Sequence, residues 1–76
     1  MVMRLSNTKL GNRGKIVKIE GNDEFKKRLL SMGFFEGEEV LVENISLFGS
    51  PIIVNVRSTK LALRKEEAER VVVDVS

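Results

Sequence analysis

The chain has 76 residues, 42% of them apolar, with no cysteine and no histidine, and its 13 basic and 11 acidic residues leave a formal net charge of +2. A chain of this length supports one hydrophobic core, so residues 1–76 are expected to form a single domain. The lack of cysteine excludes disulfides and thiolate metal ligands. No apolar run approaches the ~20 residues needed to cross a bilayer, and no signal-peptide core follows Met1. We therefore expect a cytoplasmic protein without membrane insertion.

A short strand is predicted near the N-terminus. Residues 5–10 form only a lead-in segment, and residues 11–14 have the Gly and Asn density of a turn. Residues 15–19 are rich in β-branched side chains and are followed by a Gly-Asn-Asp break, which indicates a strand of about five residues.

A helix is predicted over residues 24–32. Asn22 or Asp23 can cap its N-terminus, and acidic residues occupy its first turn. Apolar residues recur at positions i, i+4 and i+7, so one face of the helix is predicted to face the core. The residues of this face are Phe25, Leu29 and Met32.

The segment after the helix contains two glycines around a phenylalanine pair. Gly33 stands where a helix commonly ends in a left-handed residue, and Gly37 is expected to open the turn into the next strand. Phe34 and Phe35 are adjacent, and neighbours in an extended or turn conformation cannot both point into the core. We expect Phe34 to be buried and Phe35 to be exposed.

The second half of the chain predicts three strands in succession. Residues 39–45 form the first, and residues 52–57 and 59–63 alternate in polarity as the two arms of a hairpin that reverses at Arg57-Ser58. Gly49 and Pro51 shape the preceding loop, since proline is tolerated at the start of a strand.

The C-terminal segment predicts a helical turn over residues 65–69 and a last strand over residues 71–75. That strand is rich in valine and needs a neighbour on each side, because a free apolar edge would invite aggregation. Five short strands and one helix in so small a chain predict a mainly β fold, a small closed or partly open barrel.

The residues available for chemistry do not favour catalysis or metal binding. Histidine, the usual general base at neutral pH, and cysteine, the most reactive nucleophile, are both missing. The clustered Glu36, Glu38 and Glu39 follow a turn and are expected to be a solvated acidic loop. We therefore expect no enzyme, no cofactor and no metal site formed by this chain alone.

A nucleic-acid-binding barrel is a second functional hypothesis, since small barrels often bind single strands. No tyrosine or tryptophan is present to stack on bases, which makes nucleic acid a less favoured partner. The basic residues that would serve are Lys9, Arg13, Lys15, Lys18, Lys26, Lys27 and Arg28.

Exposed apolar turns favour a protein-binding surface instead. Phe35 follows the helix, and Leu47-Phe48 occupies the loop before Pro51, so both turns are expected to project from the barrel. The candidate protein-binding residues are Phe35, Leu47, Phe48 and Ser50, the last in the same loop as Leu47.

Several motifs in order resemble the FeoA family, the small companions of the ferrous iron transporter FeoB, from Leu5 to Val75. They are Gly11 and Gly14; Arg28-Leu29-x-x-Met32-Gly33-x-x-x-Gly37; Gly49-x-Pro51-Ile52; and Leu61-Ala62-Leu63-Arg64-x-x-x-Ala68 before the valine strand. Two positions depart from the pattern, because Ser50 stands where the family often has Asp and Ser58 where Gly is usual.

The resemblance implies an SH3-like barrel, no enzymatic activity and a regulatory or accessory role in ferrous iron transport. The implied partner is FeoB, engaged through its cytosolic GTPase-containing region; the family also implies some link to transition metal ions, and a homo-oligomer is left open. The same domain type occurs at the C-terminus of repressors related to DtxR. The lack of a helix-turn-helix segment favours the free-standing form, although a stand-alone relative of the repressor domain is kept as an alternative.

Overall fold

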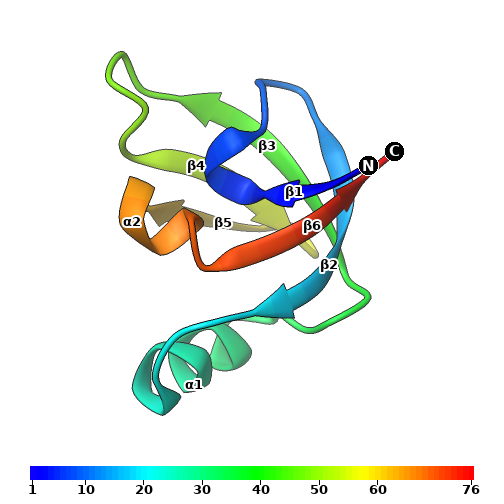
Figure 1. Ribbon diagram of the computed structural model, residues 1–76, viewed down its shortest axis with the longest axis vertical. Coiled ribbons are helices and arrows are strands. Elements are labelled where there is room, and N and C mark those ends of the chain that lie inside the picture. The colour runs from blue at the N-terminus through cyan, green and yellow to red at the C-terminus, as the bar shows by residue number, and fades with distance from the viewer.

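The computed structural model describes residues 1–76 as one antiparallel sheet of six strands that curls around a single core (Figure 1). The strands follow the order β1-β6-β2-β3-β4-β5, so β1 and β5 are the two edges. The elements are β1 (Val2–Arg4), a 3-10 turn η1 (Leu5–Asn7), β2 (Arg13–Ile19), α1 (Asp23–Ser31), β3 (Glu39–Ile45), β4 (Ile52–Val56), β5 (Thr59–Leu63), α2 (Lys65–Ala68) and β6 (Val71–Val75). Neither α1 nor α2 is long and apolar enough to cross a membrane.

The structure contains six strands, one more than the sequence predicts, and the additional strand is β1. It has only three residues, too few to show a period of two in the sequence. It pairs with β6, placing Val2 opposite Asp74. The valine-rich β6 therefore has a strand on each side, as expected: β2 on one side and β1 on the other. The second partner is the unpredicted β1, whereas closure of the barrel by one of the predicted strands was expected.

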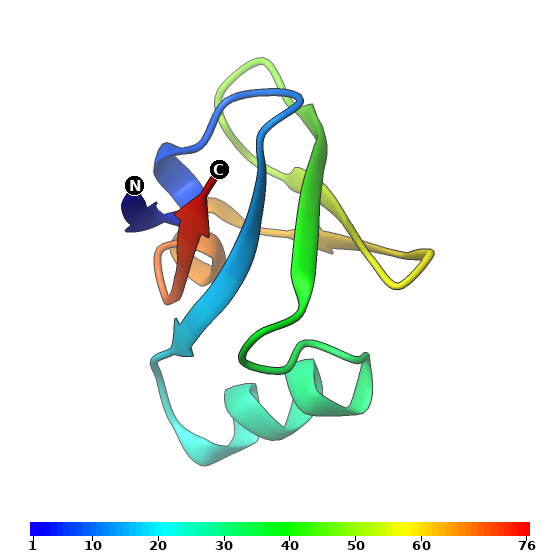
Figure 2. The ribbon, with the colours of Figure 1, turned by 90° about the vertical axis from the view of Figure 1, so that its right-hand side faces the viewer.

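The two ends of the chain lie side by side, as both ribbon views show (Figures 1 and 2). The Met1 ammonium lies 2.9 Å from an Asp74 carboxylate oxygen, and the Val75 N–H donates to the Met1 carbonyl at 2.7 Å. Pairing between β1 and β6 thus continues to the first residue.

Strand β2 begins at Arg13, two residues earlier than predicted, and includes Gly14. A Cβ atom at Gly14 would lie 2.7 Å from the carbonyl oxygen of Asp74 in β6, a distance that real Cβ atoms essentially never show. This glycine therefore belongs to a close approach of two strands and not to the turn that its neighbours suggest.

Helix α1 spans residues 23–31, one residue earlier at each end than predicted. Its cap is Asn22, whose side-chain oxygen accepts a hydrogen bond from the Phe25 N–H at 2.9 Å. Phe25 and Leu29 are buried as expected, but the prediction that Met32 also faces the core is wrong. Met32 is the C-terminal cap residue, and its side chain is exposed where the chain leaves the helical path.

The core is formed by alternate residues of the strands together with the inner face of α1. It contains Leu5, Ile16, Phe25, Leu29, Phe34, Val40, Val42, Ile52, Val54, Val56, Leu63, Ala68, Val71 and Val73. The β4–β5 hairpin covers one side and reverses at Arg57-Ser58 as predicted, with φ values of 53° and 66°. Positive φ at both central residues is the requirement of a type I′ turn.

Candidate interaction surface

The hinge after α1 is a Schellman motif. The Phe34 N–H donates to the Leu29 carbonyl at 2.9 Å, and the Gly33 N–H donates to the Leu30 carbonyl at 3.0 Å. Gly33 has a φ of 90°, the left-handed conformation that this motif requires and that the sequence predicted. The motif turns the chain sharply, and Phe34 is brought back over the helix into the core.

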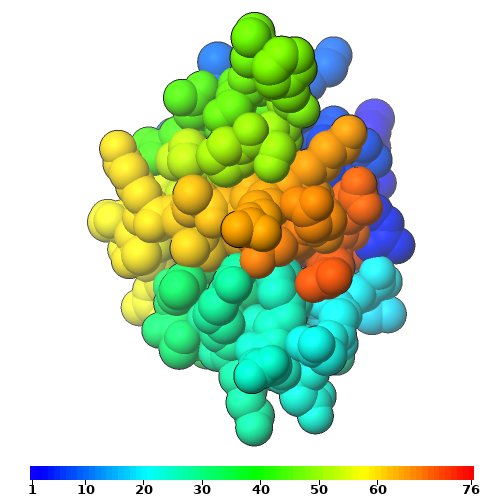
Figure 3. All heavy atoms as spheres, turned by 90° about the vertical axis from the view of Figure 1, so that its left-hand side faces the viewer, coloured from blue at the N-terminus to red at the C-terminus, as the bar shows by residue number.

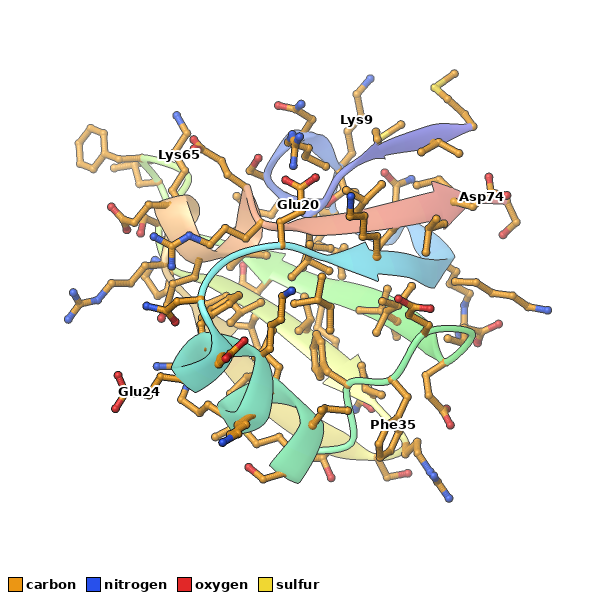
Figure 4. All side chains as sticks on the ribbon, turned by 60° about the horizontal axis from the view of Figure 1, so that its bottom comes forward. Lys9, Glu20, Glu24, Phe35, Lys65 and Asp74 are labelled. Atoms are coloured by element: carbon orange, nitrogen blue, oxygen red, sulfur yellow. The ribbon has the colours of Figure 1, made fainter.

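The phenylalanine pair divides as expected. Phe34 is 1% exposed and Phe35 is 41% exposed. The Gly37 N–H donates to the Ile16 carbonyl at 2.7 Å. This hydrogen bond connects the segment that follows the two phenylalanines to β2. Figure 4 shows Phe35 on the outside of the molecule, beyond the end of α1. Its exposure is confirmed, and its role in binding stays a prediction.

The loop between β3 and β4 holds the most exposed apolar side chains of the chain. Leu47 is 90% exposed and Phe48 is 88% exposed. The loop is nevertheless ordered by backbone hydrogen bonds, because the Gly49 N–H donates to the Ser46 carbonyl at 2.8 Å and the Ser46 N–H donates to the Pro51 carbonyl at 3.2 Å. Two large apolar side chains are thus held in solvent by a defined turn.

Ser50 forms a hydrogen bond that the sequence does not predict. Its hydroxyl accepts a hydrogen bond from the Lys65 N–H, the first residue of α2, at 3.1 Å. The contact ties the loop to the start of that helix. Ser50 therefore positions Leu47 and Phe48 relative to the barrel, while its own contact with a partner stays a prediction.

The predicted binding residues do not form one surface. Phe35 lies at the α1 end of the molecule (Figure 4), whereas the β3–β4 loop lies at the opposite end in both ribbon views (Figures 1 and 2). Figure 3 shows the same separation on one face, with β5 and α2 between the loop and α1.

Sequence reasoning missed the exposed Leu10, which belongs to the turn before β2, a segment that both ribbon views show at the same end as the β3–β4 loop (Figures 1 and 2). The turn that carries it is held against β3 by two hydrogen bonds, from the Gly11 N–H to the Val42 carbonyl at 2.8 Å and from the Val42 N–H to the Asn12 carbonyl at 2.9 Å. The sequence did contain a signal for this exposure, because Leu10 stands directly before the Gly11-Asn12 turn. We call Leu10, Leu47 and Phe48 the loop-end patch, and Leu30, Met32 and Phe35 the helix-end patch.

Three of the basic residues of the N-terminal half are engaged by carboxylates of this chain. Arg13 pairs with Glu39 at 3.2 Å, Lys18 with Glu20 at 3.8 Å and Arg28 with Glu67 at 2.6 Å. These carboxylates partly neutralise the positive charge of that half. The arrangement gives the nucleic-acid hypothesis no additional support.

Glu67 is the most embedded carboxylate among these pairs. Burial by itself raises its pKa, but hydrogen bonds from the Arg64 N–H and the Arg28 guanidinium, with the charges of both arginines, outweigh burial and hold the pKa below its ordinary value of 4.5. No group of three or more His, Cys, Asp or Glu side chains is placed to hold a metal ion. The Glu67 carboxylate is thus an ion-pair and capping partner.

Six short antiparallel strands around one core, joined by projecting loops, make this molecule a small SH3-like barrel. A solved structure with this fold is that of FeoA from Stenotrophomonas maltophilia complexed with zinc, described as a prokaryotic SH3 domain protein. The two structures agree with a TM-score of 0.83 at 38% identity, over 95% of this chain and 89% of that one.

The sequence pattern of the FeoA domain matches residues 3–75, and the chain therefore belongs to the FeoA family. A putative Fe(2+) transport protein A of Campylobacter jejuni is 32% identical over 96% of this chain and 99% of its own length. Membership of this family makes the protein a non-enzymatic accessory in ferrous iron transport, which confirms the resemblance found in the sequence.

A second relative joins two functions in one chain. An Fe(2+) transport protein A/Fe(2+) transporter FeoB fusion protein of Porphyromonas gingivalis is 33% identical over 96% of this chain. This chain spans only 9% of the length of that fusion protein.

Proposed function

We propose that this protein regulates or assists ferrous iron uptake in the cytoplasm by binding the cytosolic region of an FeoB-type transporter. The observation that carries the proposal is the fusion relative, in which a domain 33% identical to this chain is covalently joined to FeoB. Fusion keeps two proteins at high effective concentration, an arrangement that suits partners that work in contact.

The loop-end patch is the docking surface that we favour. Leu47 and Phe48 expose almost their whole side chains, and their loop is held by backbone hydrogen bonds and by Ser50. Burying preordered apolar side chains in a partner gains hydrophobic free energy at a small cost in conformational entropy. Lys9 and Lys65 form no ion pair within the chain, so both can meet carboxylates of the partner.

A capture experiment tests both the partner and the surface. The FeoB cytosolic region of the same organism is immobilised, and the parent chain is compared with Leu47→Ala/Phe48→Ala, with Phe35→Ala and with the combined Phe35→Ala/Phe48→Ala variant. Val17→Ala is a matched control, because Val17 is a partly exposed apolar residue on β2 outside both patches. We expect the loop variant to lose binding and the control to retain it.

The outcomes separate the parts of the proposal. Loss only with Phe35→Ala would move the docking surface to the helix-end patch. Full binding by the combined Phe35→Ala/Phe48→Ala variant would remove both assignments. Failure of the parent chain to bind FeoB, with ferrous iron uptake unchanged in cells that lack this chain, would overturn the proposed function itself.

A further inference from the structure

Strand β5 leaves one side of the sheet without a hydrogen-bonding neighbour. It pairs only with β4 and stands at the end of the strand order. The register places Val56 opposite Thr59 across the two-residue turn, and Val54 opposite Leu61. In an antiparallel hairpin of this type these pairs exchange the ladder hydrogen bonds, while the residues between them direct their N–H and C=O groups outward.

The outward groups belong to Lys60 and Ala62. Neither residue donates or accepts any other backbone or side-chain hydrogen bond through its main chain. Both side chains are exposed, so nothing covers the edge from the outer face. Two alternate residues with free donors and acceptors form the template that an extended peptide needs in order to add a strand.

The opposite edge of the sheet offers no comparable template. Strand β1 has three residues, and η1 follows it directly. The Arg4 guanidinium at its end donates to Glu20 at 2.7 Å and to the Glu69 carbonyl at 2.8 Å. Strand β1 is therefore the shorter of the two edges, and the five-residue β5 offers the longer template for pairing.

A groove runs beside β5 and separates it from the C-terminal turn of α1. It measures about 560 Å³, and its wall combines the apolar Met32, Pro51, Leu61 and Ala62 with the charged Arg28, Arg64 and Glu67. Figure 3 shows β5 and α2 as the yellow-to-orange band across the middle of this face, with α1 below it. A strand added to β5 would place alternate side chains in this groove.

The positive charge along the β5 edge favours a peptide that carries acidic side chains. The segment 57–65 contains Arg57, Lys60, Arg64 and Lys65 and no acidic residue. Arg57 and Lys60 have largely exposed side chains and approach the partly buried carboxylates of Glu38 and Glu43 only at 3.5 Å and 3.7 Å, distances too long for a close ion pair. Arg64 and Lys65 form no ion pair.

We infer that the free edge of β5 binds an acidic, extended peptide segment of another protein as a seventh strand. Main-chain hydrogen bonds to Lys60 and Ala62 hold the segment, the groove takes its alternate apolar side chains, and the basic residues of segment 57–65 take its carboxylates. The main-chain groups of Lys60 and Ala62 that carry this inference lie outside the loop-end patch, and Lys65 is named for both surfaces.

The test uses the full chain and the synthetic peptide acetyl-(Glu-Val)3-amide, which spans about 20 Å when extended, enough to cover β5. Titration into the isotope-labelled protein is followed by the amide NMR signals. We expect the largest shifts at Lys60 and Ala62, slowed hydrogen exchange at both amides, and weaker binding at higher salt. The peptide acetyl-(Lys-Val)3-amide is the charge control and should bind more weakly.

Two variants separate strand addition from a general electrostatic contact. Ala62→Pro removes an outward N–H without removing a ladder bond, so the fold is expected to survive and peptide affinity to fall by about tenfold. Ala62→Ser is its matched control and should bind as the parent does. The variant Lys60→Glu/Arg64→Glu reverses two exposed charges and should bind the lysine peptide more tightly than the glutamate peptide. This test does not require the proline variant to fold.

Four results would overturn the inference. They are no binding of the acidic peptide, equal affinity of a folded Ala62→Pro variant, shifts centred on the loop-end patch, and protection of Lys60 and Ala62 without peptide in a concentration-dependent dimer. The last would show that a second copy of this chain occupies the edge.

Discussion

Arg28 and Glu67 join the two helices through an ion pair of 2.6 Å between guanidinium nitrogen and carboxylate oxygen. The other oxygen of the same carboxylate accepts the Arg64 N–H at 2.9 Å, which closes the first turn of α2. One side chain therefore caps a four-residue helix and connects it to α1. So short a helix has little stability of its own, and this contact provides much of its support.

Acid should release that contact. Because the pKa of Glu67 is lowered in the folded protein, its stabilising contribution is complete above pH 4.5 and is lost as pH falls through the lowered value. We expect Glu67→Gln to reduce the free energy of unfolding at pH 7 by about 1 kcal/mol and to differ less from the parent below pH 4.5. Urea unfolding across pH measures this, with the exposed Glu66→Gln as control. A pH-independent difference would contradict the assignment.

Gly33→Ala should destabilise through backbone conformation alone. No atom lies within 4 Å of the position of an added Cβ, yet φ is 90°. We expect a loss of about 1–2 kcal/mol. Gly33→Asn should lose less, since asparagine tolerates the left-handed region. Chemical denaturation compares the two, and an alanine variant as stable as the parent would disprove the strain.

Gly14→Ala should destabilise for a different reason. Its Cβ would meet the Asp74 carbonyl at 2.7 Å, so β2 and β6 must separate. We expect a cost of about 1–3 kcal/mol. Unlike Gly33, this site should not be relieved by asparagine, because the obstacle is backbone and any side chain meets it. Recovery of stability in Gly14→Asn would show that the close approach is not the cause.

The β4–β5 turn can be improved. Arg57 and Ser58 both hold positive φ, and Asn-Gly is the preferred pair for such a turn. We expect Arg57→Asn/Ser58→Gly to raise the free energy of unfolding by about 1 kcal/mol. Little is lost with the Arg57 side chain, which reaches Glu38 only at 3.5 Å. A melting temperature at or below that of the parent would contradict this prediction.

The adjacent phenylalanines should differ sharply in unfolding experiments. Phe34→Ala removes a fully buried ring and should cost about 3–5 kcal/mol. Phe35→Ala truncates a side chain that is 41% exposed and should cost less than about 1 kcal/mol. Similar losses in the two variants would mean that Phe35 belongs to the core.

Most of the fold could be predicted because its signals are local. The alternation of residues 52–57 and 59–63 and the glycine after α1 each determine their own surroundings, and the structure agrees with them. Strand β1 escaped prediction because three residues at an edge carry no period, and its existence depends on β6 at the other end of the chain. The strand role of Gly14 depends on Asp74 in the same way.

The candidate surface was harder to predict because position in space, and not residue type, defines it. The exposure of Phe35, Leu47 and Phe48 followed from the sequence. The sequence does not predict that Phe35 and the loop lie at opposite ends of the molecule, since this depends on how the whole sheet curls. The free edge of β5 needs the complete strand order, which no single segment contains.

The contact between Met1 and Val75 has a consequence for engineering. A domain that enters and leaves at one point can be grafted into a surface loop of a host protein without separating its first strand from its last. Equally, joining the two ends by a short linker and reopening the chain at the β3–β4 loop should give a circular permutant with an unchanged core.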